Sequence, residues 1–342
     1  MAERPPRAMI LGCAGTELTE TERRFFADAD PLGFILFARN CVDPRQLSAL
    51  IGALRQSVGR ADAPVLIDQE GGRVTRLKPP HWWAAPAARC YADLARANAD
   101  LGAEAAHLGA RLVAAELHEL GITINCVPVL DLPQPGANSV IGDRAFGDTP
   151  AGAAALGRAV CEGVLDGGLL PVVKHSPGHG RALVDSHEAL PEVTVGRDEL
   201  EAVDWAPFRA LSAMPWAMTG HVVYRSIDAD RPATTSATVI ERVIRGAIGF
   251  DGVLVTDDLS MKALKDGPGP SAGAALAAGC DLALHCNGVL SEMEAVRDAV
   301  RPCAEATLDR LARAEAMRRR PKPFDPAWAR RRLEDLLRGQ TG

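Results

Sequence analysis

The sequence predicts an α/β fold of the (β/α)8 TIM-barrel type, formed as a single domain with extra helices at its C-terminal end. Short apolar runs rich in β-branched residues alternate with longer stretches of helical periodicity, which is typical of a mostly parallel sheet. Eight such runs can be distinguished, and eight strands with crossover helices suit a closed barrel better than an open sheet. No low-complexity linker divides the chain.

The expected strands are residues 8–13, 33–37, 64–67, 123–129, 170–173, 216–219, 252–256 and 281–285. The expected helices are 17–27, 44–58, 94–120, 150–165, 197–211, 237–248, 272–278, 290–319 and 326–337. We expect 1–342 to form one domain, of which 320–342 is a helical extension. The Gly- and Pro-rich segment 266–271 is short, so it is predicted to be a loop after a strand.

Composition excludes several classes of protein. Hydrophobic residues make up 47% and charged residues 24% of the 342 residues, as in ordinary globular chains. The net charge of -6 predicts no nucleic-acid partner, and the lack of an 18-residue apolar run predicts no membrane span. The oligomeric state is not predicted.

Eight cysteines without a Cys-x-x-Cys pair favour free buried thiols over disulfides. The apolar stretch near the N-terminus is too short for a signal-peptide core and fits a first strand better. A cytoplasmic location is therefore expected.

Polar residues gather where the expected strands end. They are Asp68 and Glu70, Asp131, Lys174 and His175, His221, Asp257 and Asp258, and Asn287. Barrel enzymes build their sites from the C-terminal ends of the strands, because those ends meet on one open rim. Six polar strand ends on one rim indicate an active site rather than a purely structural barrel.

The segment 255–261 places two aspartates at the end of a strand. A carboxylate there can attack the C1 atom of a sugar as a nucleophile, and an aspartate before a helix can also serve as its N-cap. Adjacent strand residues point to opposite faces, so we expect one aspartate in each role.

The loop 174–187 carries three histidines and an aspartate. Histidine suits a general acid near neutral pH, and Asp185 could orient the ring of His187. Two alternatives remain: His179 holds the loop in shape, or the histidines and Asp185 bind a metal. The lack of a His-Glu-x-x-His helix disfavours the metal, and the lack of a Gly-x-Ser-x-Gly elbow disfavours serine-based hydrolysis.

The segment 68–76 combines Asp68 with two glycines that permit a sharp turn. Asp68 can accept hydrogen bonds from sugar hydroxyls, whereas Glu70 could simply pair with an arginine of the same segment. The loop 142–148 adds Arg144, which taken alone is most simply a solvated charge.

Together these segments resemble glycoside hydrolase family 3, and within it the bacterial cytoplasmic β-N-acetylglucosaminidases of cell-wall recycling. The resemblance is specific because six motifs stand in the family's order. They are Asp-Gln-Glu-Gly-Gly-Arg-Val (68–74), Asn-Cys-Val-Pro-Val-Leu-Asp (125–131), Arg-Ala-Phe (144–146), Lys-His-Ser-Pro-Gly-His-Gly (174–180), Asp-Ser-His (185–187) and Thr-Asp-Asp-Leu-Ser-Met (256–261). Ser176, Val184 and the segment 265–271 depart from the family's usual residues.

The resemblance implies retaining glycosidase chemistry with no cofactor and no metal. It makes Asp257 the nucleophile, Asp258 a structural residue, and Asp185 with His187 the acid/base dyad. The residues that match the family's N-acetylglucosamine-binding positions are Asp68, Arg76, Arg144, Lys174 and His175. The implied substrate is a muropeptide-derived disaccharide, N-acetylglucosamine linked to 1,6-anhydro-N-acetylmuramic acid, with or without peptide. Two alternatives stay open, a phosphorylase and a catalytically silent sugar-binding barrel.

Overall fold

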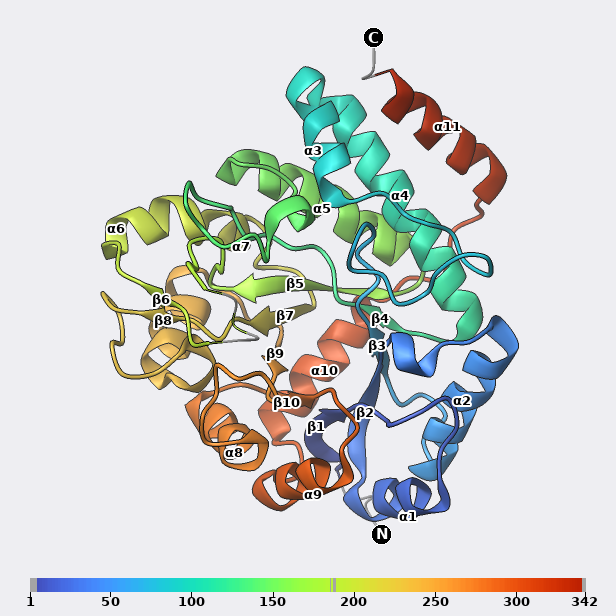
Figure 1. Ribbon diagram of the computed structural model, residues 1–342, viewed down its shortest axis with the longest axis vertical. Coiled ribbons are helices and arrows are strands. Elements are labelled where there is room, and N and C mark those ends of the chain that lie inside the picture. Colours follow the sequence, from blue (N-terminus) through green and yellow to red (C-terminus); the bar gives the residue numbers. More distant parts are fainter. Residues whose placement is uncertain (1–4, 185, 187–188, 340–342) are drawn as a thin grey trace.

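The computed structural model describes residues 5–184, 186 and 189–339, and it contains a closed barrel of eight parallel strands (Figure 1). Around the barrel the strands are β1 (Arg7–Leu11), β2 (Pro31–Leu36), β3 (Val65–Ile67), β4 (Ile124–Asn125), β5 (Leu170–Ser176), β7 (Trp216–Thr219), β9 (Val253–Asp258) and β10 (Leu282–His285). Strand β10 closes the barrel by pairing with β1, with Met9 opposite Ala283. The predicted barrel and all eight predicted strands are confirmed.

The strands are recognisable in sequence because they are buried on both faces. Every residue of β2, β3, β5, β7 and β10 is buried, as expected for a parallel sheet lined inside by side chains and covered outside by helices. Strand β4 is shorter than predicted. Pro128 has no backbone N–H, and only an isolated bridge between Val129 and Lys174 continues the pairing.

The helices on the outside of the barrel are α1 (Glu20–Ala29), α2 (Pro44–Ser57), α3 (Ala88–Ala97), α4 (Ala99–Leu120), α5 (Pro150–Asp166), α6 (Arg197–Glu199), α7 (Ala206–Ala210), α8 (Pro268–Ala278), α9 (Leu290–Ala299), α10 (Glu305–Met317) and α11 (Pro326–Arg338). Two π-helical segments, Leu200–Asp204 and Val239–Ala247, lie in the predicted helices 197–211 and 237–248. A two-stranded sheet that was not predicted, β6 (Glu192–Val193) with β8 (Val223–Tyr224), lies outside the barrel.

Three predicted helices have different limits, for local reasons. The expected helix 94–120 is two helices, because the side chain of Asn98 accepts hydrogen bonds from the backbone N–H groups of Asp100 and Leu101 and starts α4 there. The expected helix 290–319 divides into α9 and α10 around Pro302. The segment 266–271 was wrongly predicted to be a loop, since α8 begins at Pro268, a residue suited to a first helical turn.

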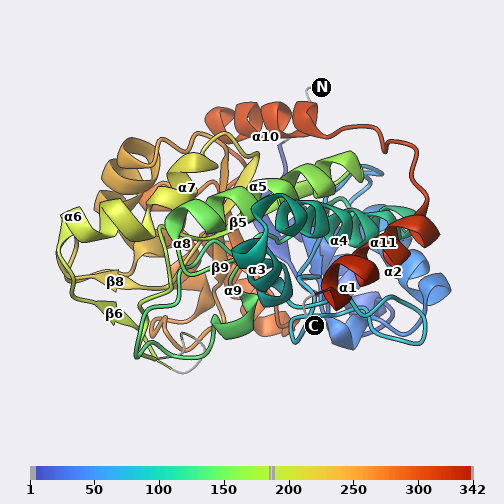
Figure 2. The ribbon, with the colours of Figure 1, turned by 90° about the horizontal axis from the view of Figure 1, so that it is seen from above.

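Helix α10 crosses the barrel on the side opposite to the open rim (Figure 2). A buried carboxylate, Asp281, joins it to the barrel just before β10. One oxygen of Asp281 accepts hydrogen bonds from Thr307 (3.1 Å) and Arg310 (2.9 Å) of α10. The other accepts from Arg245 (2.8 Å) and from the backbone N–H of Leu254 in β9 (2.9 Å). The carboxylate of Asp281 thus connects α10 to β9 and β10.

All eight cysteines lie in the described part of the chain, where none of them forms a disulfide, and six of them are buried, as predicted. Among the described residues, no helix is long and apolar enough to cross a membrane.

Replacing Asp281 should destabilise the protein strongly. Asp281→Asn keeps the shape of the side chain but leaves Arg245 and Arg310 without their counter-charge, so we expect a loss of roughly 2–4 kcal/mol in urea unfolding. The matched control is Asp251→Asn, which removes exposed ion pairs with Arg310 and Arg313 and should change stability by less than about 0.5 kcal/mol. Equal effects of the two substitutions would contradict the structural role given to Asp281.

Candidate active site

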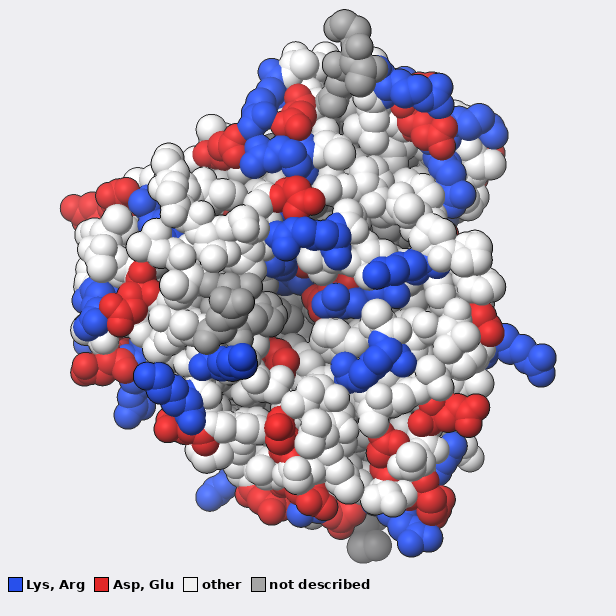
Figure 3. Space-filling view, viewed as in Figure 1, with Lys and Arg blue, Asp and Glu red and all other residues white. Residues whose placement is uncertain are grey.

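An open cavity of about 390 Å³ lies at the C-terminal ends of the barrel strands, where Figure 3 shows a hollow in the face of the molecule. Its polar and charged lining consists of Asp68, Glu70, Arg73, Arg76, Arg144, Lys174, His175, His179, Ser186, Asp257 and Asp258. Apolar side chains complete the walls, among them Phe37, Met218 and Leu284. The site therefore has the position and the mixed lining of a ligand pocket in a barrel enzyme.

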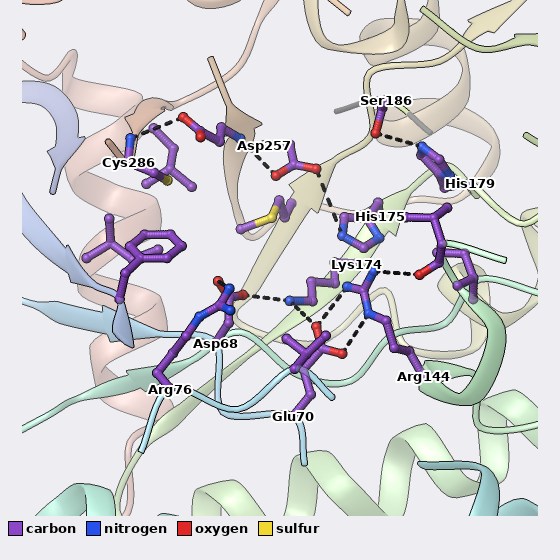
Figure 4. A pocket seen from close by; sticks show the side chains of 18 of the residues that line it. Asp68, Glu70, Arg76, Arg144, Lys174, His175, His179, Ser186, Asp257 and Cys286 are labelled. Atoms are coloured by element: carbon purple, nitrogen blue, oxygen red, sulfur yellow. Dashed lines mark hydrogen bonds and ion pairs between the residues drawn. The ribbon is translucent and has the colours of Figure 1, made fainter. Parts of the chain in front are cut away.

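The floor of the cavity is an ion-pair network centred on Lys174 (Figure 4). Lys174 Nζ lies 2.7 Å from Asp68 Oδ1 and 2.7 Å from Glu70 Oε1. The second oxygen of Asp68 accepts a hydrogen bond from Arg76 (3.1 Å). Arg144 donates two hydrogen bonds to Glu70, at 2.8 and 2.9 Å. Three cations and two carboxylates thus share the floor.

These contacts keep both carboxylates ionised. Burial by itself would raise the pKa of Asp68, but Lys174 and Arg76 outweigh it and hold that pKa well below its ordinary value. Burial also disfavours the charged form of Glu70, yet Lys174 and Arg144 lower its pKa from 4.5 to about 2. The pKa of Lys174 is raised in turn, because the two carboxylates more than compensate its burial.

Backbone geometry carries these side chains to the rim. Gly71 and Gly72 have φ angles of 98° and 55°, and a Cβ on Gly71 would lie 2.3 Å from the carbonyl oxygen of Pro86. The buried side chain of Gln69 accepts hydrogen bonds from the backbone N–H groups of Arg76 (2.8 Å) and Leu77 (3.0 Å). The turn after β3 is therefore closed, with Asp68 and Arg76 facing each other.

Asp131 organises the loop after β5. It is buried, and its carboxylate accepts hydrogen bonds from His175 Nδ1 (2.7 Å) and from the backbone N–H of His179 (2.6 Å). Burial alone would raise the pKa of Asp131, but the two histidines hold it below its ordinary value. Because an ionised carboxylate only accepts hydrogen bonds, His175 carries a proton on Nδ1 and presents Nε2 to the cavity.

Asp257, at the end of β9, faces the cavity with one oxygen unoccupied. Its Oδ1 accepts a hydrogen bond from the backbone N–H of Asp258 (2.8 Å). Its Oδ2 lies 3.9 Å from His175 Nε2 and has no hydrogen-bond donor among the described residues. Burial opposes its ionisation, but His175, the backbone N–H of Asp258 and Lys174 lower its pKa below the ordinary value. Asp257 is thus an ionised carboxylate with an oxygen free to react.

Asp258 has a different environment. Its carboxylate accepts hydrogen bonds from the backbone N–H groups of Ser260 and Cys286, both at 3.1 Å, and from the Ser260 hydroxyl at 2.6 Å. It ties the end of β9 to the end of β10. The expectation that one aspartate caps the next helix was wrong, because the N-cap position of α8 is Gly267.

His221 supports the end of β9 through its two ring nitrogens. Its Nε2 donates to the backbone carbonyl of Asp258 (3.0 Å), and its Nδ1 accepts from the hydroxyl of Thr234 (2.7 Å). Burial lowers the pKa of His221 and so favours the neutral ring. His221 therefore holds the backbone at the end of β9, where the two aspartates lie, in a fixed position.

The structure brings together most of the site residues predicted from sequence. Lining one cavity are Asp68, Arg76, Arg144, Lys174, His175 and Asp257. Asp185 and His187 lie outside the described residues. Two of the simpler alternatives were wrong: Arg144 is mostly buried rather than solvated, and Glu70 pairs with Lys174 and Arg144 rather than with an arginine of its own segment.

Sequence reasoning assigned no role to Asp131 and only structural alternatives to Glu70 and His179, although each stood in a motif or at a strand end. Their position on the rim was the signal available in the sequence, but their hydrogen-bond and ion-pair partners lie in distant segments of the chain. Among the described residues, no group of three or more potential ligands could hold a metal ion.

The fold and the cavity together define a TIM-barrel enzyme with a carboxylate-rich site. Residues 10–315 match the model of the glycosyl hydrolase family 3 N-terminal domain. A β-hexosaminidase of Alkalilimnicola ehrlichii is 38% identical over 340 residues, covering 93% of this chain and 97% of the relative. A β-hexosaminidase of Pseudomonas aeruginosa is 39% identical and covers 82% of each chain. The protein therefore belongs to glycosyl hydrolase family 3.

Solved structures agree with this assignment. The crystal structure of NagZ from Neisseria gonorrhoeae in complex with N-trifluoroacetyl-D-glucosamine has a TM-score of 0.87 and 32% identity, covering 98% of this chain and 100% of the other. A family 3 β-N-acetylglucosaminidase from Paenibacillus has a TM-score of 0.85 and 32% identity over 96% of this chain, which spans 66% of that longer chain.

The Glu70 ion pairs predict a pH-dependent contribution to stability. The folded-state pKa of Glu70 lies below the ordinary value, so its contribution is complete above pH 4.5 and is lost as the pH falls towards 2. Glu70→Gln should therefore lower the free energy of unfolding by roughly 2–4 kcal/mol at pH 7 and flatten its fall between pH 4.5 and 2. Urea unfolding at a series of pH values measures both effects.

Glu20→Gln is the control, since Glu20 pairs with Arg24 on an exposed helix face. It should leave the pH dependence as it is in the unmodified protein. If Glu70→Gln retained the full loss of stability between pH 4.5 and 2, the ion pairs on the cavity floor would not be its source.

Proposed function

We propose that this family 3 glycoside hydrolase is a retaining exo-β-N-acetylglucosaminidase. It releases terminal N-acetylglucosamine from peptidoglycan fragments in cytoplasmic cell-wall recycling. The observation that carries the proposal is Asp257, an ionised carboxylate with a free oxygen at the open rim of the barrel. β-Hexosaminidase activity in the name of the Alkalilimnicola relative and a glucosamine derivative bound to the Neisseria enzyme support this choice of sugar.

Asp257 acts as the nucleophile in this mechanism. One of its oxygens attacks C1 of the sugar, the bond from C1 to the leaving oxygen breaks, and a covalent glycosyl–enzyme forms. The hydrogen bond from the Asp258 N–H keeps the carboxylate turned towards the cavity. The lowered pKa of Asp257 means that no proton has to be removed before the attack.

His187, oriented by Asp185, supplies the proton for the leaving oxygen and then removes a proton from the attacking water. This assignment rests on the Asp-Ser-His motif at 185–187, because both residues lie outside the described part of the chain. A histidine is well suited to the double role, since its unperturbed pKa lies near neutral pH. The second attack at C1 restores the original configuration of the sugar.

The remaining polar groups bind the sugar. Asp68, Arg76 and Lys174 present hydrogen-bond acceptors and donors on one side of the cavity floor, and His175 presents Nε2 beside Asp257. Arg144 holds Glu70, which pairs with Lys174, in place from the other side and also lines the cavity. Fixed charges of this kind recognise several hydroxyl groups at little entropic cost.

Removing the nucleophile tests the central step. Asp257→Ala should lower kcat/KM for 4-nitrophenyl N-acetyl-β-D-glucosaminide by at least about 10⁴-fold, because a bond formed along the reaction path is lost. Asp258→Asn, which weakens the hydrogen bonds from Ser260 and Cys286, should cost far less activity. Near-normal turnover by Asp257→Ala together with loss in Asp258→Asn would reverse the two assignments.

The same assay distinguishes the proposed hydrolase from the two alternatives, a catalytically silent barrel and a phosphorylase. A glucoside control reports specificity for the acetamido sugar, and a catalytically silent barrel would hydrolyse neither substrate. Formation of N-acetylglucosamine 1-phosphate in phosphate buffer, absent in phosphate-free buffer, would show a phosphorylase instead of a hydrolase.

The acid/base assignment predicts a dependence on the leaving group. His187→Ala should lower kcat/KM by about 10²-fold or more for a disaccharide substrate, whose leaving oxygen needs a proton. For 2,4-dinitrophenyl N-acetyl-β-D-glucosaminide, whose leaving group departs without a proton, kcat/KM should change little. The same loss on both substrates would indicate a role in binding or folding.

A further inference from the structure

The segment that follows β5 is attached to the protein along its first part and exposed further on. As far as Ala182 it is firmly attached, since Arg181 donates a hydrogen bond to Asp204 (2.8 Å) and the carbonyl of Ala182 accepts one from the backbone of the loop after β4 (2.8 Å). Beyond this point Leu183 and Val184 are 67% and 39% exposed. The segment thus leaves the body of the protein just before the Asp-Ser-His motif.

Ser186 differs sharply from these exposed neighbours. It is only 3% exposed and lines the catalytic cavity (Figure 4). Its hydroxyl lies 3.2 Å from His179 Nε2, and its backbone carbonyl accepts a hydrogen bond from the N–H of Ala263 (3.2 Å). Ser186 therefore contacts two separate parts of the rim, one through its side chain and the other through its backbone.

His179, the first of these contacts, is a rigid support. Its backbone N–H donates to Asp131, and its ring lies edge-on to that of His175 with the centroids 6.0 Å apart. Burial lowers the pKa of His179 to about 4, so the ring stays neutral at the pH where a histidine can act as the general acid. The expectation that His179 shapes the loop agrees with these contacts.

Ala263, the second contact, belongs to the turn that follows the nucleophile strand. This turn starts at Asp258, whose carbonyl accepts a hydrogen bond from the N–H of Met261 (3.2 Å). The backbone of Ser186 is thereby joined to the turn that begins directly after Asp257.

We propose that Ser186 is a positioning residue for proton transfer, because it ties the acid/base segment both to His179 and to the turn behind Asp257. The inference rests on the proposed function, in which Asp185 and His187 are the direct sequence neighbours of Ser186. A general acid must reach its target oxygen to within about 3.2 Å, so a small displacement of this segment weakens proton donation. Sugar binding on the cavity floor does not depend on Ser186.

The test compares two leaving groups in a Ser186→Ala variant. Loss of one hydrogen bond should lower kcat/KM by about tenfold for a disaccharide substrate. For the 2,4-dinitrophenyl glycoside, which needs no proton, kcat/KM should stay within about twofold. Because kcat/KM covers only the steps up to formation of the glycosyl–enzyme, the comparison isolates donation of the proton to the leaving oxygen.

Three further variants complete the design. Ser186→Thr keeps the hydroxyl and should restore most of the lost activity. His179→Phe should reproduce the leaving-group-dependent loss, and combining it with Ser186→Ala should add little, because both remove the same contact. Ser226→Ala is the matched control: it removes a hydroxyl that donates to the Val195 carbonyl (2.9 Å) outside the site and should affect neither substrate.

Equal losses on both substrates, or none on either, would overturn the role of Ser186. These outcomes are distinguishable from failure of the proposed function. If the proposed function failed, the unmodified protein would not hydrolyse the glycosides, or His187→Ala would show no dependence on the leaving group.

Discussion

The site depends on one buried charge, the ammonium group of Lys174 on the floor of the cavity. Its side chain is only 2% exposed, and a buried ammonium is costly unless carboxylates are close by. Asp68 and Glu70 supply them, and Arg76 and Arg144 hold those carboxylates from the outside. Lys174 also adds to the effect of His175 in lowering the pKa of the nearby Asp257.

Another buried carboxylate, Asp131, supports two other parts of the site. It orients the ring of His175 towards Asp257 and also holds the backbone at His179, from which Ser186 is reached. Asp131 therefore supports both the ring beside Asp257 and the loop from which Ser186 is reached. The ion pairs of the cavity floor are formed instead by Lys174, Asp68, Glu70, Arg76 and Arg144. Ser186 contacts His179 and Ala263 rather than these ion pairs, so we expect its variants to affect protonation and not sugar binding.

Much of the fold could be predicted, because its signals are local. The barrel strands are apolar runs because helices cover one face and packed side chains fill the other. Helix ends were less predictable where a single residue decides: Asn98 starts a new helix inside a continuous helical pattern, and Pro268 starts one inside a segment that looked like a loop. At both places the chain could continue in more than one way, and tertiary packing selects one.

Periodicity and residue type were enough to predict the barrel, its polar rim and the family motifs. The partners of the charged side chains depend on how distant segments pack. Glu70 pairs with Arg144, 74 positions away, and Lys174 with Asp68, 106 positions away. Coulomb attraction acts through space and not along the chain, so no local pattern distinguishes the buried pairs from solvated charges. For the same reason the two neighbouring aspartates look equivalent in sequence, whereas one faces the cavity and the other binds two strand ends together.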